Sequence, residues 1–323
     1  MLAAMLLVPS VGSVSAAPAD GSYIASVEDV GPQEQRIYVY SAAMDTQIEL
    51  VVWRPADTST PAPILYLLNG AGGGEDAASW TAQTHAQDFF KNKHVNVVMP
   101  IGGKWSYYTD WRNPDPVLGV NKWRTFLTEE IPPLLDAQLG STGVNTLAGL
   151  SSSGTSVLQL AIGAPGLYRG VAAYSGCAQT SDPIGQRYVR IAVDVWGQGN
   201  ADNMWGPNSD PEWAANDPYL HAEGLRGLAL FISNGSGLPG PHDTLTDPRI
   251  DGNGPKLANQ IIVGGIIEAA TNYCTYNLQH RLNELGIPAT YSFRDTGTHS
   301  WGYWEDDLHQ SWPMLAEAMN IPA

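Results

Sequence analysis

Residues 146–154 read Thr-Leu-Ala-Gly-Leu-Ser-Ser-Ser-Gly, an apolar run that ends in three serines and a glycine. The apolar part predicts a buried strand, and the residues that follow, from Thr155 to Ala161, predict a helix. A serine on a tight turn from strand to helix is typical of a nucleophile elbow. An ordinary helix cap is the alternative, because serine is also favoured at that position.

The three serines can be told apart by their neighbours. In a nucleophile elbow the residues two before and two after the nucleophile must be small, because the turn presses them against the adjoining strand and helix. Ser151 meets this condition, with Gly149 before it and Ser153 after it. The next serine would place Leu150 in the tight turn, and the one after it would place Thr155 there. We therefore predict Ser151 as the nucleophile, in a motif that carries serine in place of its last glycine.

Outward from this turn, apolar runs alternate with helical patterns along the chain. The alternation predicts a mostly parallel sheet flanked by helices, and with the elbow it indicates the α/β-hydrolase fold. Residues 180–217, rich in Trp, Asn, Asp and Pro, have no clear period and are expected to form an inserted loop or cap region. The expected strands are Ile48–Val52, Ile64–Leu68, Val95–Met99, Thr146–Leu150, Gly170–Ser175, Leu228–Ser233 and Thr290–Phe293; the expected helices are Lys122–Leu139, Gly154–Ile162, Gln260–Glu284 and Asp306–Met319.

A serine hydroxyl needs a neighbouring imidazole to take its proton. In this fold the order along the chain is nucleophile, acid and histidine. Among the five histidines after Ser151, His299 lies in Gly-Thr-His-Ser-Trp, a short turn between the last expected strand and the last expected helix. The others lie in irregular regions or expected helices, so His299 is predicted as the base. They are His221, His242, His280 and His309.

The tetrahedral intermediate requires two backbone N–H donors. One is expected from Ser152, the residue after the nucleophile. The other is expected from Ala71, within the glycine-rich loop at residues 69–74 that follows an early strand.

Several residues could supply the acid. Asp243, Asp247 and Asp251 follow the expected strand at residues 228–233, where many proteins of this fold carry it, and Glu268 lies in an expected helix. The pattern alone favours Asp243 or Asp247.

Composition narrows the class of protein. The chain has 323 residues, 16 basic and 32 acidic, and its formal net charge of −16 argues against nucleic acid as a partner. Neither clustered His and Cys ligands nor a dinucleotide or phosphate loop occurs, so no metal and no organic cofactor is expected.

The first residues predict export. Residues 1–17 carry an apolar run and then small residues, as in a secretory signal that lacks its usual basic start, and a single catalytic domain is expected over residues 18–323. No later stretch is long enough to span a bilayer. The two cysteines, Cys177 and Cys274, favour a disulfide in an exported chain, with two buried thiols as the alternative.

Several separated segments resemble the secreted mycolyltransferases of the antigen 85 group and their corynebacterial and rhodococcal relatives. The similarity runs from about Ile64 to Trp304. It rests on Tyr66–Gly70, Val98–Gly103, Tyr107–Trp111, Lys122–Thr128, Gly149–Ser151, Met204–Pro207, Ser209–Pro211, Asn216–Pro218 and Gly297–Trp301.

This resemblance implies the same nucleophile and base, Ser151 and His299. It places the acid on a helix about thirty residues before the histidine, which moves the assignment to Glu268 and leaves Asp243 as second choice. A Cys177–Cys274 disulfide would then hold the helix that carries the acid.

The same resemblance implies sugar contacts near the glycine-rich loop and the histidine turn, for which the expected residues are Asn69, Gly70, Ser300 and Trp301. Mycobacterial members read Asp-Gly-Leu-Arg where this chain reads Asn-Gly-Ala-Gly at residues 69–72, so sugar binding is expected to differ.

The implied activity is transfer of a mycolyl group from trehalose monomycolate, through an acyl-Ser151 intermediate, to trehalose or cell-wall arabinan. The expected location is the cell envelope or the medium. A secreted carboxylesterase is the first alternative, and a non-catalytic surface-binding protein is the second.

Overall fold

A nine-stranded sheet forms the centre of the molecule in the computed structural model, which describes residues 21–323. The strand order is β1-β2-β3-β5-β4-β6-β7-β8-β9. β1, β2, β3 and β5 pair antiparallel, and the pairs from β5 and β4 through to β9 are parallel. The strands are β1 Tyr23–Gly31, β2 Glu34–Ser41, β3 Thr46–Trp53, β4 Ile64–Leu68, β5 Asn96–Ile101, β6 Asn145–Leu150, β7 Tyr168–Tyr174, β8 Ala229–Asn234 and β9 Thr290–Phe293.

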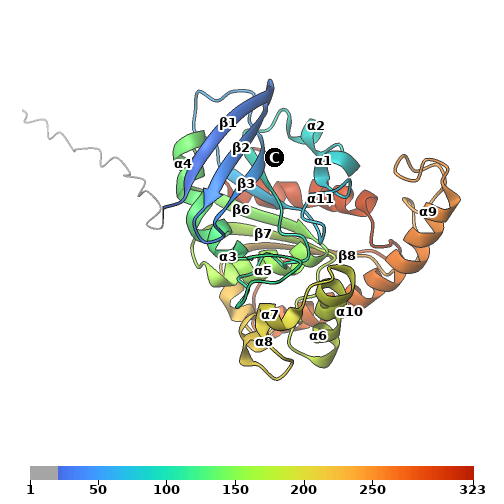
Figure 1. Cartoon of the computed structure of the whole chain (residues 1–323). Helices are drawn as coiled ribbons and strands as arrows, with labels where there is room; N and C mark the ends of the chain where they lie inside the picture. Colours follow the sequence, from blue (N-terminus) through green and yellow to red (C-terminus); the bar gives the residue numbers. More distant parts are fainter. Residues whose placement is uncertain (1–20) are drawn as a thin grey trace, which may run out of the picture.

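Helices cover both faces of this sheet (Figure 1). One face packs against α4, α5 and α10, and the other against α1, α2 and α11. The helices are α1 Trp80–Gln83, α2 Ala86–Phe90, α3 Trp123–Thr125, η1 Phe126–Glu130, α4 Ile131–Leu139, α5 Ser152–Gly163, α6 Pro183–Arg190, η2 Ile191–Trp196, α7 Ala201–Trp205, α8 Pro211–Ala215, η3 Ala222–Leu225, α9 Gly254–Asn259, η4 Gln260–Gly264, α10 Gly265–Glu284 and α11 Trp301–Ala318.

The two-sided burial explains why the central strands read as continuous apolar runs. In β4, Tyr66 and Leu68 belong to the core beneath α5 and α10, whereas Leu65 and Leu67 belong to the core beneath α11. A parallel strand covered on both faces needs apolar side chains at every position. The predicted α/β-hydrolase architecture is thereby confirmed.

Two features go beyond the sequence-based expectation. The edge strand β1 was not predicted, because most of its side chains are exposed and no apolar alternation marks it; β2, its neighbour, was also not predicted. The inserted region at residues 180–217 is largely helical, formed by α6, η2, α7 and α8. Its tryptophans Trp205 and Trp213 are buried in a small separate core with Tyr107.

A disulfide joins Cys177, shortly after β7, to Cys274 in α10, which confirms that prediction. Within residues 21–323, no helix combines the length and the apolar character needed to cross a bilayer. The predicted signal sequence, residues 1–17, lies outside the described residues.

Candidate active site

Ser151 lies on the turn between β6 and α5, in a backbone conformation that side chains rarely adopt (φ +57°, ψ −125°). The turn brings Gly149 against Ser153, where a Cβ on the glycine would come within 2.7 Å of the Ser153 carbonyl oxygen. Gly154 is equally constrained, since a Cβ there would lie 2.7 Å from the carbonyl oxygen of Tyr174. Such strain persists only where the surrounding structure enforces it, and it often marks a functional residue.

Ser153 replaces the last glycine of the motif without opening the turn. Its side chain is fully buried, and its hydroxyl accepts a hydrogen bond from the Leu150 N–H at 2.9 Å. The hydroxyl can in turn donate to the Leu150 carbonyl, also at 2.9 Å. The serine therefore satisfies backbone groups of the turn that a glycine would leave to other partners.

The imidazole of His299 lies between Ser151 and Glu268. Its Nε2 is 2.8 Å from the Ser151 hydroxyl oxygen, and its Nδ1 is 2.8 Å from a carboxylate oxygen of Glu268. The ring also packs edge to face against Trp304, with centroids 4.8 Å apart. The three side chains that sequence analysis selected are thus brought into one hydrogen-bonded chain.

Glu268 is wholly buried in α10, yet its second carboxylate oxygen accepts three further hydrogen bonds. The donors are the Ser175 hydroxyl at 2.8 Å, the Asn234 amide at 3.0 Å and the Gly235 N–H at 2.6 Å. An ionised carboxylate only accepts hydrogen bonds, and this set of donors suits it.

Sequence analysis missed these supporting residues. Ser175, Asn234 and Gly235 come at the ends of β7 and β8, where the carboxyl ends of parallel strands gather functional groups. Ser175 also receives a hydrogen bond from the Trp304 indole N–H at 3.1 Å. The available signal was a polar residue at or just after the end of a buried strand, as with Asn234 at the end of β8 and Ser175 after β7.

Next to Glu268 lie the partly buried Arg294 and the buried Asp307. The Arg294 guanidinium comes within 4.0 Å of the Glu268 carboxylate and contacts the carboxylate of Asp307. Burial raises the pKa of the Asp307 carboxyl to about 7, and the nearby Arg294 partly offsets this effect.

Asp243 and Asp247, which the pattern alone favoured as the acid, do not contact His299. Asp243 accepts hydrogen bonds from the Thr298 hydroxyl and the Tyr303 hydroxyl, each at 2.6 Å. It therefore holds the turn that carries His299. Asp247 instead lies 3.1 Å from Nδ1 of His242. The positional preference was wrong because the side chain of Asp243 is engaged by Thr298 and Tyr303 and that of Asp247 by His242 and Arg249, so neither carboxylate reaches the imidazole of His299.

A half-open apolar pocket lies above Ser151, and the space between its walls, together with the solvent at its mouth, amounts to about 930 Å³. Ala71 and Ser152, the predicted oxyanion donors, both line it together with Ser151 and His299. One wall comes from η2 and the other from η4 and α10, and both are mainly aliphatic. The wall residues are Ile191, Ala192 and Trp196 on one side and Val263, Ile266 and Ile267 on the other.

Asn69, one of the four predicted sugar contacts, points into the protein. Asn69 is 1% exposed, and its side-chain oxygen accepts a hydrogen bond from the Trp80 N–H at 3.0 Å. The side chain therefore stabilises the loop from inside, and the expectation that it contacts a sugar is corrected. The loop folds inward at Gly74, where φ is +74° and a Cβ would lie 2.4 Å from the Asn69 amide.

The other three candidates surround the site without entering the pocket lining. A Cβ at Gly70 would meet the Leu150 side chain at 2.8 Å, so the glycine allows close packing against the elbow. Ser300 precedes α11 and is 7% exposed. Trp301 stacks edge to face on Trp80, with ring centroids 5.5 Å apart.

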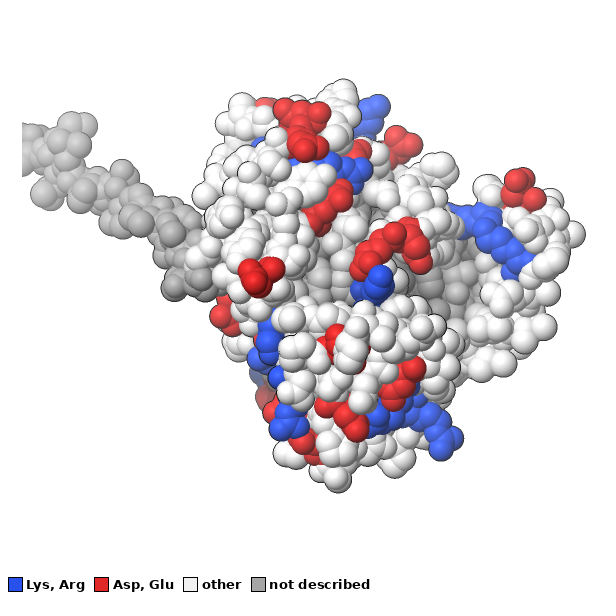
Figure 2. Space-filling view, viewed as in Figure 1, with Lys and Arg blue, Asp and Glu red and all other residues white. Residues whose placement is uncertain are grey.

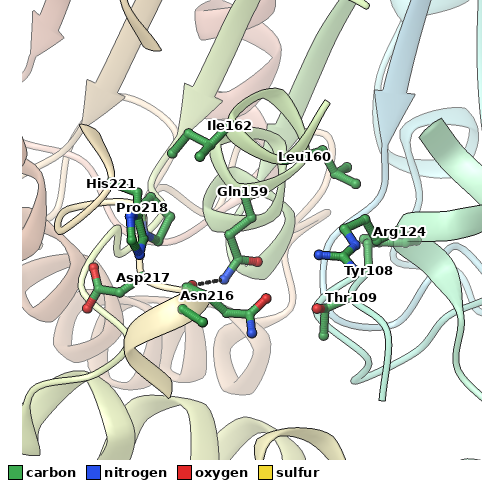
Figure 3. A pocket seen from close by; sticks show the side chains of 12 residues that line it. Tyr108, Thr109, Arg124, Gln159, Leu160, Ile162, Asn216, Asp217, Pro218 and His221 are labelled. Carbon is green, nitrogen blue, oxygen red and sulfur yellow. Dashed lines mark hydrogen bonds between the residues drawn. The ribbon is translucent and has the colours of Figure 1, made fainter. Parts of the chain in front are cut away.

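A second, smaller pocket lies beside the far half of α5, away from the N-terminal end that carries Ser151 (Figure 3). Gln159 points into it and donates from its amide nitrogen to the Asn216 carbonyl, while Arg124 and Thr109 face it from the other side (Figure 3). Neither Ser151 nor His299 lines this pocket. Within residues 21–323, no group of His, Cys, Asp and Glu side chains is arranged to hold a metal ion.

Comparison with known proteins gives consistent matches. The sequence model of the Esterase family, described as "Putative esterase", matches residues 41–315. The chain is 30% identical over 320 residues to the diacylglycerol acyltransferase/mycolyltransferase Ag85A of Mycobacterium leprae, covering 97% of this chain and 90% of that protein.

Solved structures agree on the fold. The crystal structure of Mycobacterium tuberculosis MPT51 superimposes with a TM-score of 0.71 at 21% identity, covering 91% of this chain and 99% of the other. An S-formylglutathione hydrolase from Agrobacterium tumefaciens gives a TM-score of 0.59 at 15% identity, covering 92% and 99%.

Proposed function

Since the chain belongs to the Esterase family and, within it, to the antigen 85 group of acyltransferases, we propose that it moves a mycolyl group from trehalose monomycolate to a sugar hydroxyl through an acyl-Ser151 intermediate. The observation that carries this proposal is the hydrogen-bonded chain of Ser151, His299 and Glu268 at the base of a large apolar pocket. The geometry supplies a nucleophile and a base, and the pocket supplies space for a long acyl chain.

The first half-reaction forms the acyl-enzyme. Nε2 of His299 takes the proton of the Ser151 hydroxyl while the oxygen attacks the ester carbonyl of the donor. The backbone N–H groups of Ala71 and Ser152 stabilise the oxyanion of the tetrahedral intermediate. When the intermediate collapses, the ester C–O bond breaks, and the imidazolium returns its proton to the departing trehalose oxygen.

The second half-reaction repeats these steps with a new alcohol. His299 takes the proton of an acceptor hydroxyl, whose oxygen attacks the carbonyl carbon of acyl-Ser151. As the ester bond to Ser151 breaks, the imidazolium returns the proton to the serine oxygen. Glu268 fixes the imidazole tautomer throughout and stabilises the imidazolium that forms in each step. The proposed acceptors are trehalose and cell-wall arabinan.

Water competes with the alcohol for the acyl-enzyme. The aliphatic walls of the pocket limit the access of water to the acyl-Ser151 ester and so favour the alcohol. We propose that the protein acts outside the cytoplasm, at the cell envelope. The signal-like residues 1–17 and the Cys177–Cys274 disulfide support this location, because structural disulfides form in oxidising compartments.

The test is an assay of the purified protein and of Ser151→Ala on trehalose monomycolate, with lipid products separated by chromatography. Trehalose dimycolate that forms only with the intact serine is the expected result. The match to the Esterase family also supports a second candidate, a carboxylesterase, for which free mycolate would be the sole product with or without added trehalose. Absence of any serine-dependent product would contradict both and favour a binding role.

A further inference from the structure

Exposed apolar side chains gather at the mouth of the pocket above Ser151. Trp196, Val263 and Ile266 line the pocket and yet remain 47%, 41% and 68% exposed. Immediately beside them, Val195 is 65% exposed and Ile262 is 62% exposed, and neither lines the pocket. The apolar surface of the pocket thus continues outward onto the surface of the protein, over η2 on one side and η4 and α10 on the other. We call these five residues the apolar rim.

Charge is absent from the α10 side of this rim. Between Lys256 and Arg281 the sequence contains no Lys, Arg or Asp and a single Glu, Glu268, whose side chain is wholly buried; His280 lies at the far end of α10. On the visible face of the arm formed by α9 and α10, basic side chains gather toward the α9 end and most of the remaining surface carries no charge (Figure 2).

The η2 side carries charge, but the charges balance. Arg190 forms ion pairs with Asp194 at 3.2 Å and with Asp202 at 2.7 Å. Arg187 is exposed and lies in the same surface hollow as Val195. Large exposed apolar patches generally mark a surface that contacts a protein or a membrane.

We propose that the apolar rim docks the enzyme onto the surface of a neutral lipid assembly, from which the acyl donor passes directly into the pocket. This inference rests on the proposed acyl transfer, since it names where that reaction takes its substrate. Continuity between the rim and the pocket favours a lipid surface, because an acyl chain drawn along this route leaves one apolar environment for another and is never exposed to water.

The charge distribution selects the kind of lipid. Anionic membranes are bound through clusters of Lys and Arg that carry excess positive charge. Beside the rim, Arg187 and Arg190 are balanced by Asp194 and Asp202, so no such excess is present there. The excess negative charge of the whole protein would oppose approach to such a membrane. A surface of uncharged or zwitterionic headgroups is therefore the partner that fits.

The experiment compares the full chain with a Val195→Asp/Ile262→Asp variant in flotation with phosphatidylcholine vesicles. These residues are exposed and lie outside the pocket lining, so folding and turnover of a short-chain, water-soluble ester should be unchanged. We expect the variant to lose at least about tenfold in vesicle partition, because two charges would have to enter the lipid interface. The matched control is Val30→Asp/Val117→Asp, at residues that are 52% and 57% exposed elsewhere, and it should float like the parent.

Each result decides the proposal. Parent protein that does not float, or a rim variant that floats as well as the parent, would overturn it. Equal loss in the control variant would also overturn it, because binding would then be unspecific. If the parent is dimeric in size-exclusion chromatography and the rim variant is monomeric, the rim is an interface between copies and the proposal fails. If the parent does not hydrolyse the soluble ester at all, the proposed function fails. The flotation result then still decides whether the rim binds lipid, because flotation does not depend on turnover.

Discussion

Nδ1 of His299 lies 2.8 Å from one carboxylate oxygen of Glu268, while the other oxygen of that carboxylate is held by three donors from the ends of β7 and β8. The carboxylate of Glu268 is therefore fixed by the sheet rather than by its own helix. This arrangement gives the imidazole a single orientation, with Nε2 directed at Ser151.

Replacing Glu268 by Gln tests that relationship. The amide keeps the size of the side chain but presents either a donor or a weaker acceptor to Nδ1, and it no longer balances an imidazolium. By analogy with other triads we expect kcat to fall by about 10⁴-fold with little change in KM. Steady-state kinetics on a soluble ester would measure both constants.

Asp243→Asn is the matched control, because Asp243 reaches the histidine turn only through Thr298 and Tyr303. We expect it to lower thermal stability and to reduce kcat by about tenfold at most, as for a residue outside the reacting groups. A larger loss from Asp243→Asn than from Glu268→Gln would reverse the two roles.

The order of elements allowed Ser151 and His299 to be brought together from the sequence, because Ser151 directly follows the buried apolar strand β6 and His299 lies in a short turn between the last strand and the last helix. Glu268 was not predictable in this way. It lies inside a long helix with no local motif, and its contacts with His299 and with the ends of β7 and β8 exist only in the folded chain. The resemblance to a known family was needed to select it.

The error at Asn69 has a different origin. A polar residue beside a glycine-rich loop was expected to face the ligand, but the glycines at 73 and 74 adopt positive φ and turn the loop inward. The side chain then becomes a partner for the backbone of α1. Loop direction depends on such backbone conformations, which residue types alone do not determine.

Asn69→Ala should consequently behave as a core mutation. The buried Trp80 N–H would lose its partner, and we expect the free energy of unfolding to fall by about 1–3 kcal/mol. Denaturant unfolding would measure this change. A variant of unaltered stability but raised KM for a sugar acceptor would restore the original expectation of a substrate contact.

The disulfide should stabilise the region that carries Glu268. Cys274 lies six residues after Glu268 on α10 and is tied across 97 residues to Cys177, which lines the pocket. For a loop of that length the chain-entropy model gives about 4–5 kcal/mol of stabilisation. The Cys177→Ser/Cys274→Ser variant should lose a stability of this order in chemical denaturation.

Reduction of the disulfide is the control. A reductant should lower the free energy of unfolding of the parent toward that of the variant and leave the variant unchanged. A parent that the reductant does not affect, or a variant as stable as the parent, would contradict a stabilising role.

His242 should make stability depend on pH near neutrality. Its pKa is raised above the ordinary value of 6.5, chiefly by the hydrogen bond to Asp306 at 2.8 Å and also by that to Asp247 at 3.1 Å. The guanidinium of Arg249 lies 3.5 Å from the Asp247 carboxylate, so Asp247 is shared between His242 and Arg249.

A base whose pKa is higher in the folded state binds more protons there than in the unfolded chain. The resulting stabilisation is complete below about pH 6.5 and disappears as the pH rises through the raised pKa. The imidazole of His242 also packs against Gly302 at the start of α11. Its deprotonation therefore takes place next to the turn that carries His299. Unfolding followed from pH 5.5 to 8.5 should show stability falling with pH in the parent and a flatter profile in His242→Gln. If the free energies of unfolding of the parent and of His242→Gln change in parallel with pH, the ion pairs of His242 do not contribute to stability. If the two converge at high pH, their difference at low pH gives the contribution of these ion pairs.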